Sequence, residues 1–205
     1  MKQLLYVFAA VLLIGIIGYT FWQPAGPNAD QQQAYYDVIR KQRQQKDQMF
    51  KSGKDSPLTD EQKETFTALD YYPPAWTFRF TAQLDYFSAD KPTIQLPTNT
   101  GETQTVRPIG FAFFRSGEKR IKLTVYQSLD EDTYFLPFRD LTTGKTTYPA
   151  GRYLEPKVRG KVIEIDFNYA YNPYCAYNEN YVCPLPPEEN TLPIAVEAGE
   201  KYVPL

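Results

Sequence analysis

Residues 76–86 read WTFRFTAQLDY, and apolar and polar side chains alternate along this stretch. Successive side chains of a β-strand point to opposite faces, so the pattern predicts a long strand with one buried face. Similar short apolar runs follow, with turn-forming residues and no helical patterns between them. We expect further strands at residues 93–96, 103–106, 109–115, 120–127, 134–138, 146–154, 161–168 and 192–196.

Turn chemistry between these runs indicates that neighbouring strands pair in an antiparallel way. Ser116-Gly117-Glu118 and Thr143-Gly144 have the composition of tight turns between paired strands. Short strands at this spacing are typical of an antiparallel sheet that closes into a β-barrel or packs as a sandwich. The sequence therefore predicts a mainly β (α+β) fold, with a β-rich domain over residues 71–205.

Residues 28–70 form a helical segment before the strands. The stretch 31–51, QQQAYYDVIRKQRQQKDQMFK, carries a sparse apolar stripe among many Gln, Lys and Arg side chains, which predicts a helix with a solvated middle. Thr59 followed by Gln62 is a capping box. It predicts a second, short helix from residue 60 to about residue 68.

Residues 4–22, LLYVFAAVLLIGIIGYTFW, contain no charged side chain. A helix of this length crosses a bilayer, whereas the apolar part of a secretory signal peptide, the alternative, is usually shorter. Lys2 is the only charged side chain before the run, so the positive-inside rule places residues 28–205 outside the cytoplasm. We expect residues 1–27 to be a membrane anchor and short linker, with one transmembrane helix in the bacterial inner (cytoplasmic) membrane and a periplasmic or extracellular C-terminal domain.

The composition excludes several kinds of chemistry. The chain has no His, which removes Ser-His-Asp, Cys-His and zincin mechanisms. Two Cys are too few for a zinc site made of thiolates, and no phosphate-binding Gly-rich loop or calcium loop is present. A net charge of -2 gives no overall positive field for nucleic acid. We therefore expect no metal, no cofactor and no nucleic-acid partner.

Residues 166–190, DFNYAYNPYCAYNENYVCPLPPEEN, differ from the rest of the chain because Tyr and Asn alternate within a frame of Cys and Pro. In one interpretation the tyrosines cover an open end of the barrel and the asparagines satisfy backbone groups in tight turns. In the other, the tyrosines stack on a ligand and the asparagines supply donors and acceptors. The partner would then be a polar small molecule, a glycan or an envelope protein.

Several stretches between residues 40 and 201 carry a resemblance to a known family. They are DSPL at 55–58, YPP at 72–74, FRD at 138–140 with Gly144, TY at 147–148, GRYL at 151–154, DFN at 166–168, AYNPYCAY at 170–177, CPLPP at 183–187, EN at 189–190 and AGE at 198–200. Through these residues the chain resembles a bacterial family known as domain of unknown function 1684. The resemblance implies no activity, substrate or catalytic residue.

Cys175 and Cys183 have seven residues between them. Outside the cytoplasm two such thiols are normally oxidised, which predicts a disulfide that closes a small loop. The resemblance also includes proteins that carry the same Cys pair but have no anchor. Unpaired thiols are therefore the alternative.

Charged and polar residues of the distinctive stretches are the candidates for a binding site. Arg139 and Arg152 could capture a carboxylate or phosphate, or they could pair with Asp166 or Asp140 to lock strand ends, which is the interpretation we prefer. We expect the candidates to gather near one end of the barrel; they are Arg139, Asp140, Arg152, Asp166, Asn168, Tyr171, Asn172 and Tyr174.

Three functions fit these candidates. The first is a membrane-anchored extracytoplasmic domain that binds a polar ligand or a protein partner through residues 166–190. The second is a His-independent hydrolase or lyase that uses Asp166 with Arg139 or Arg152, which requires these groups to converge in one open site. The third is a purely structural envelope protein, in which the same residues only hold the loop.

Overall fold

The computed structural model describes residues 26–89, 91–129 and 133–204. The chain divides into two compact units, Met1–Tyr35 and Tyr36–Leu205, and the sheet belongs to the second. Residues 4–22, the expected membrane anchor, lie outside the described residues. Among the helices of the described ranges, none is both long and apolar enough to cross a bilayer.

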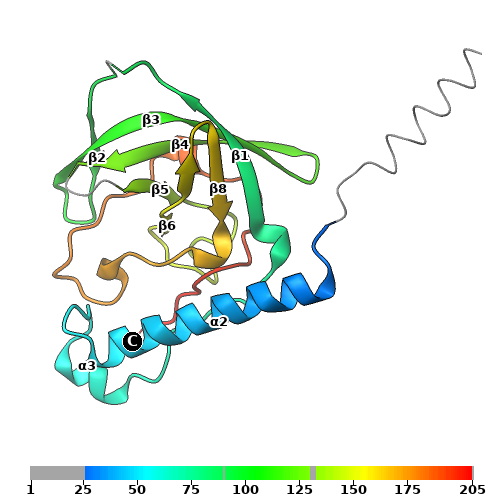
Figure 1. Ribbon diagram of the computed structural model, residues 1–205. Coiled ribbons are helices and arrows are strands. Elements are labelled where there is room, and N and C mark those ends of the chain that lie inside the picture. Colours follow the sequence, from blue (N-terminus) through cyan, green and yellow to red (C-terminus); the bar gives the residue numbers. More distant parts are fainter. Residues whose placement is uncertain (1–25, 90, 130–132, 205) are drawn as a thin grey trace, which may run out of the picture. The chain divides into compact units, whose positions relative to one another are not determined.

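The second unit is built on an eight-stranded sheet in which every strand pair is antiparallel (Figure 1). The strand order is β6-β5-β4-β3-β1-β8-β7, and β2 pairs with β3 off this path. The strands are β1 (Arg79–Tyr86), β2 (Ile94–Pro97), β3 (Thr103–Ser116), β4 (Lys119–Ser128), β5 (Tyr134–Phe138), β6 (Arg152–Leu154), β7 (Lys157–Arg159) and β8 (Val162–Asp166). The mainly β, antiparallel fold is thereby confirmed.

The sheet is a curled half-barrel, so the prediction of a closed barrel or a sandwich was too specific. Its edge strands β6 and β7 follow each other in the chain with only Glu155 and Pro156 between them. The outer edge of β6 pairs instead with the 166–190 segment, because Tyr153 and Tyr171 exchange N–H···O bonds of 2.9 and 3.0 Å. The outward backbone groups of Tyr153 in β6 are therefore not available to pair with β7, the other edge strand, and close the barrel.

Several predicted strand limits were wrong. Residues 103–106 and 109–115 belong to the single strand β3, which continues through a register shift between Pro108 and Gly110. A Cβ atom at Gly110 would lie 2.4 Å from the carbonyl oxygen of Asp85, so this close strand approach requires glycine. Within the predicted strand 146–154, only Arg152–Leu154 is a strand. Residues 76–78, at the start of the first predicted strand, form a 3₁₀-helix, and residues 192–196 do not form a strand.

The predicted alternation along β1 is confirmed by burial. Ala82 and Leu84 are at most 2% exposed, and Thr81, Gln83 and Asp85, which alternate with them, face solvent. The same alternation in the neighbouring strands places one apolar face of the sheet in the main core. That core contains Ala112, Phe114, Ile121, Leu123, Val125, Leu136, Phe138, Leu154, Ile163, Ile165, Phe167, Ala170, Leu192, Val196 and Ala198.

Two helices precede the sheet, α2 (Ala29–Ser52) and α3 (Asp60–Thr65). The capping box of Thr59 and Gln62 is confirmed, since each side chain accepts a hydrogen bond from the other residue's backbone N–H. The C-terminal part of α2 packs on the 166–190 segment through Phe50, whose ring lies 5.0 Å from that of Tyr177 in an edge-to-face contact. The helical residues thus hold this segment against the sheet.

Asn190 forms hydrogen bonds with backbone groups of β4 and β5 that do not pair with a neighbouring strand. Its replacement gives a first test of the fold. Its side chain accepts from the N–H of Thr124 at 2.8 Å and donates to the carbonyls of Thr124 and Pro137, both at 2.9 Å. Because these groups are buried, we expect Asn190→Ala to lower the free energy of unfolding by about 3 kcal/mol. Urea denaturation measures this. The exposed Asn180→Ala is the control and should change stability by less than about 0.5 kcal/mol; equal effects would contradict the assignment.

Candidate functional site

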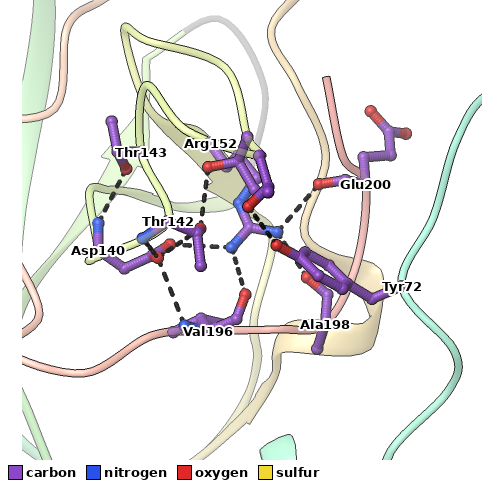
Figure 2. Close-up of polar contacts among 10 residues, drawn as sticks. Tyr72, Asp140, Thr142, Thr143, Arg152, Val196, Ala198 and Glu200 are labelled. Carbon is purple, nitrogen blue, oxygen red and sulfur yellow. Dashed lines mark hydrogen bonds and ion pairs between the residues drawn. The ribbon is translucent and has the colours of Figure 1, made fainter. Parts of the chain in front are cut away.

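Arg152 in β6 is 1% exposed and lies in a closed set of polar contacts (Figure 2). Its Nη2 donates to Asp140 Oδ2 at 2.9 Å and to the carbonyl of Val196 at 2.8 Å, and its Nη1 donates to the carbonyls of Ala198 and Glu200 at 2.5 and 3.0 Å. Burial lowers the pKa of the guanidinium, and Asp140 opposes that shift. The preferred structural pairing is confirmed for Arg152, and Asp140 is the partner. The terminal nitrogens of Arg152 are therefore already used within the chain.

Asp140 joins this ion pair to the turn that follows β5. Its Oδ1 accepts from the backbone N–H and the hydroxyl of Thr142 at 2.7 and 2.6 Å, and from the N–H of Val196 at 3.4 Å. Arg139, the neighbouring candidate, is half-buried, and its backbone pairs with Asn190 and Leu192. Within the described residues its side chain forms no ion pair, so the preferred pairing with Asp166 or Asp140 is wrong for Arg139. The Asp140–Arg152 pair therefore locks the chain after β5 to β6 and to residues 196–200.

Asp166 and Asn168 organise the backbone at the entrance to β1. Asp166 Oδ1 accepts from the backbone and side-chain N–H groups of Asn168 at 3.1 and 2.9 Å. The amide of Asn168 in turn exchanges two hydrogen bonds of 2.8 Å with the backbone of Ala75. This is the role that the first interpretation of residues 166–190 gave to the asparagines.

Glu200, which was not among the candidates from the sequence, is the centre of a second polar cluster. Its carboxylate is 1% exposed, and Oε2 accepts from the N–H of Asn172 at 2.8 Å and from the hydroxyl of Tyr177 at 2.9 Å. Its Oε1 forms an ion pair of 2.5 Å with Lys46 of α2. We call Glu200, Lys46, Asn172, Tyr177 and Tyr71 the Glu200 centre.

Lys46 forms the accessible side of the Glu200 centre, with a side chain that is 23% exposed. Its ammonium lies 4.8 Å from the ring centroid of Tyr171 and 5.4 Å from that of Phe50. Tyr171, Tyr174 and Tyr181 are half-buried. The aromatic faces of Tyr171 and Phe50 therefore lie next to the ion pair of Lys46 with Glu200.

Tyr71 is the fifth member because its backbone bridges directly to that of Glu200. Its hydroxyl is buried, and burial together with the Glu200 carboxylate raises the pKa of Tyr71 well above its usual value. The hydroxyl is therefore a neutral donor at physiological pH.

Three buried polar atoms around Glu200 have no hydrogen-bond partner within the described residues. They are the hydroxyl of Tyr71, Oδ1 of Asn172 and Nε of Arg152. Asn172 is 0% exposed, and its side-chain nitrogen is fully used by Tyr177 and the carbonyl of Lys201. Each of the three residues is a bridge or hydrogen-bond partner of Glu200. Unpaired buried groups are rare in folded proteins, so two donors and one acceptor on residues that contact Glu200 mark this centre as the candidate site.

The candidates from the sequence therefore divide into groups. Asp140 and Arg152 form the closed ion pair, Asp166 and Asn168 organise a turn, and Asn172 belongs to the Glu200 centre. Tyr171 lies beneath Lys46 and donates to Glu155 at 2.6 Å, while Tyr174 packs against Tyr181 with ring centroids 5.2 Å apart. Arg152 and Asn172 meet through Glu200, whose carbonyl and carboxylate they bind respectively.

Cys175 and Cys183 are free, buried thiols, so the predicted disulfide is not present and the alternative of unpaired thiols holds. The N–H of Cys175 donates to the sulfur of Cys183 at 3.3 Å, and the hydroxyl of Tyr148 lies 3.9 Å from the sulfur of Cys175. A hydrogen bond from Cys183 lowers the pKa of Cys175 to about 7. The pKa of Cys183 rises in turn, because this thiol retains the proton that both sulfurs share.

We expect Cys175 to be alkylated by iodoacetamide before Cys183, because the thiolate is the nucleophile. Since the pKa of Cys175 is lowered to about 7, its rate should rise through that pH instead of near the ordinary ~8.5. Peptide mass spectrometry of the native chain across a pH series measures both rates. Tyr148→Phe removes one hydrogen bond that lowers this pKa and should move the midpoint upward. Faster alkylation of Cys183 would contradict the assignment.

The fold and the site define a curled antiparallel β protein with a buried carboxylate centre beneath a helix. Residues 64–201 match the family described as protein of unknown function DUF1684, and the chain belongs to this family. None of the curated proteins matches the sequence. An uncharacterised protein of Haloarcula marismortui, solved in solution by NMR, is 34% identical over 85% of this chain and 97% of its own, with a TM-score of 0.64. The resemblance noted from the sequence is thereby confirmed.

Proposed function

We propose that this protein is a membrane-anchored domain outside the cytoplasm that binds a small hydroxyl-rich ligand, of the glycan class, at the Glu200 centre. The observation that carries the proposal is the pair of unpaired buried atoms beside Glu200, the hydroxyl of Tyr71 and Oδ1 of Asn172. Both residues contact the carboxylate residue directly through the backbone or a hydrogen bond.

The energetics favour a ligand that both donates and accepts hydrogen bonds. A buried polar group without a partner costs about 1–3 kcal/mol. A polyhydroxylated ligand recovers this cost, since its hydroxyls can accept from Tyr71 and donate to Asn172. The half-buried rings of Tyr171 and Tyr174 offer apolar faces for the C–H face of a sugar ring.

The chemistry of the alternatives is less well supported. A hydrolase or lyase that uses Asp166 with Arg139 or Arg152 needs these groups in one open site. Arg152 is committed to Asp140 and to three carbonyls, and Asp166 accepts two hydrogen bonds from Asn168. A purely structural role accounts for the hydrogen bonds of Asn168 and Asn190. It does not explain why the hydroxyl of Tyr71 and Oδ1 of Asn172 are buried without a partner in the described residues.

The anchor belongs to the proposal because residues 4–22 are long and apolar enough to cross a bilayer as a helix. An uncleaved anchor keeps residues 28–205 near the outer surface of the inner membrane. The ligand would then be a component of the envelope, where glycans are abundant.

A thermal-shift screen of the full chain in detergent tests the proposal. The probes are neutral and amino monosaccharides and disaccharides at millimolar concentration. A ligand present at 100 times its Kd stabilises the folded state by about 2.7 kcal/mol, so we expect a rise of several degrees in Tm for at least one probe. Glu200→Gln should abolish that rise. No shift with any sugar would overturn the assignment of a glycan ligand.

A further inference from the structure

The hairpin formed by β3 and β4 extends beyond the strands on either side of it (Figure 1). Pairing with β1 reaches only to Phe113 of β3, and pairing with β5 begins only at Tyr126 of β4. Gly117, with a φ of +59°, lies in the two-residue turn at the tip. The inner face of this end still packs on the core through Phe114 and Ile121, so the hairpin is a rigid extension of the sheet.

The projecting end is strongly basic. Residues 115–122 read RSGEKRIK, with four cations and one acid, although the whole chain has a net charge of -2. Arg115 and Arg120 are exposed and lie directly opposite each other in the ladder. Like charges in that position are destabilising. Within the described residues neither arginine, nor Lys122, has a carboxylate within ion-pair distance.

Aromatic rings lie beside these cations on the outer face of the sheet. Phe113 is 39% exposed and lies opposite Lys122 in the ladder. The ammonium of Lys122 lies 4.5 Å from the ring centroid of Phe111, which in turn packs 4.7 Å from the ring of Phe87. We call Arg115, Arg120, Lys122, Phe111 and Phe113 the basic hairpin surface.

We propose that the basic hairpin surface binds the anionic phospholipid headgroups of the membrane in which the chain is anchored. Each Lys or Arg near an anionic bilayer raises the affinity for the membrane about five-fold. Aromatic rings are favoured at the lipid–water interface. Headgroup phosphates would also relieve the repulsion between Arg115 and Arg120. The inference rests on the membrane location in the proposed function, but not on a ligand at the Glu200 centre.

Acetylation of lysines tests this inference on the full chain. The chain is placed in phosphatidylcholine nanodiscs with or without phosphatidylglycerol, and an N-hydroxysuccinimide ester labels accessible lysines for mass spectrometry. We expect Lys122 to react about ten-fold more slowly in the anionic discs, and high salt should restore its rate. Lys145, exposed on another part of the domain, is the internal control and should react equally in both.

A charge-matched pair of variants separates the hairpin from a general effect of charge. Arg115→Gln/Arg120→Gln should remove the protection of Lys122, whereas Lys54→Gln/Lys157→Gln, with the same change in net charge, should keep it. Equal rates of Lys122 in neutral and anionic discs would overturn the proposal. So would protection by a soluble polyanion such as heparin without protection by anionic discs.

The same experiment distinguishes the hairpin from the anchor. If the chain does not insert into discs, the anchor proposal fails, and the chain is added from solution to phosphatidylglycerol vesicles. Slower acetylation of Lys122 on those vesicles would still support the hairpin surface, and an unchanged rate would overturn it.

Discussion

Asp140→Asn is expected to lower the free energy of unfolding by about 3–5 kcal/mol. The change leaves the Arg152 guanidinium, 1% exposed, without its counter-charge, while each of its other hydrogen bonds goes to a neutral carbonyl. The loss arises mainly from the buried charge that stays behind and less from the net strength of the pair. Urea denaturation of the full chain gives the value.

The exposed ion pair of Arg40 with Asp37 is the matched control for this prediction. Both side chains are about half exposed or more, at 48% and 63%, so Arg40→Gln should change stability by at most about 1 kcal/mol. If Asp140→Asn changed stability by no more than this control, the structural role of the buried pair would be contradicted. An open binding role for Arg152 would then regain support.

Phe50→Ala is the second change with a large expected effect, of about 3–5 kcal/mol. Phe50 is 0% exposed and lies among the rings of Phe66, Tyr174 and Tyr177, at centroid distances of 6.0, 6.2 and 5.0 Å. The truncation leaves a cavity where the end of α2 packs on the 166–190 segment. We expect the loss to appear as a shift of the urea midpoint with an unchanged slope.

Val38 on the same helix provides the control for Phe50, because it is 56% exposed. Val38→Ala should change stability by less than about 0.5 kcal/mol. A small effect of Phe50→Ala, similar to that of Val38→Ala, would show that the end of α2 is not needed to hold the segment.

Local patterns in the sequence predicted the sheet well. The alternation in β1 and the Gly117 turn between β3 and β4 each follow from a few neighbouring residues. The openness of the sheet could not be predicted, because it depends on the pairing of Tyr153 with Tyr171, eighteen residues away, and not on any property of the strands themselves. Long-range pairing of this kind leaves no periodic signal.

The candidate site was predicted only in part, for a similar reason. Complementary charge indicated that Arg152 would pair with Asp140 or Asp166, but the choice between them was made by the fold. Asn172 was a candidate, whereas Glu200 and Lys46 were not. Lys46 was assigned to a solvated helix face, and a weak signal for Glu200 was its place in the AGE stretch at 198–200, where Gly199 has a φ of +75° and lies against the backbone of Ala170.

The most direct test of the ligand-binding account is the Tm shift that the best sugar of the screen produces in Tyr71→Phe. This variant removes only a hydroxyl without a partner in the described part of the chain, so its ligand-free Tm should equal or slightly exceed that of the wild type. We predict that the shift of several degrees seen in the wild type falls to near zero in Tyr71→Phe. An equal shift in both proteins, or a ligand-free Tm of Tyr71→Phe several degrees below that of the wild type, would contradict the account.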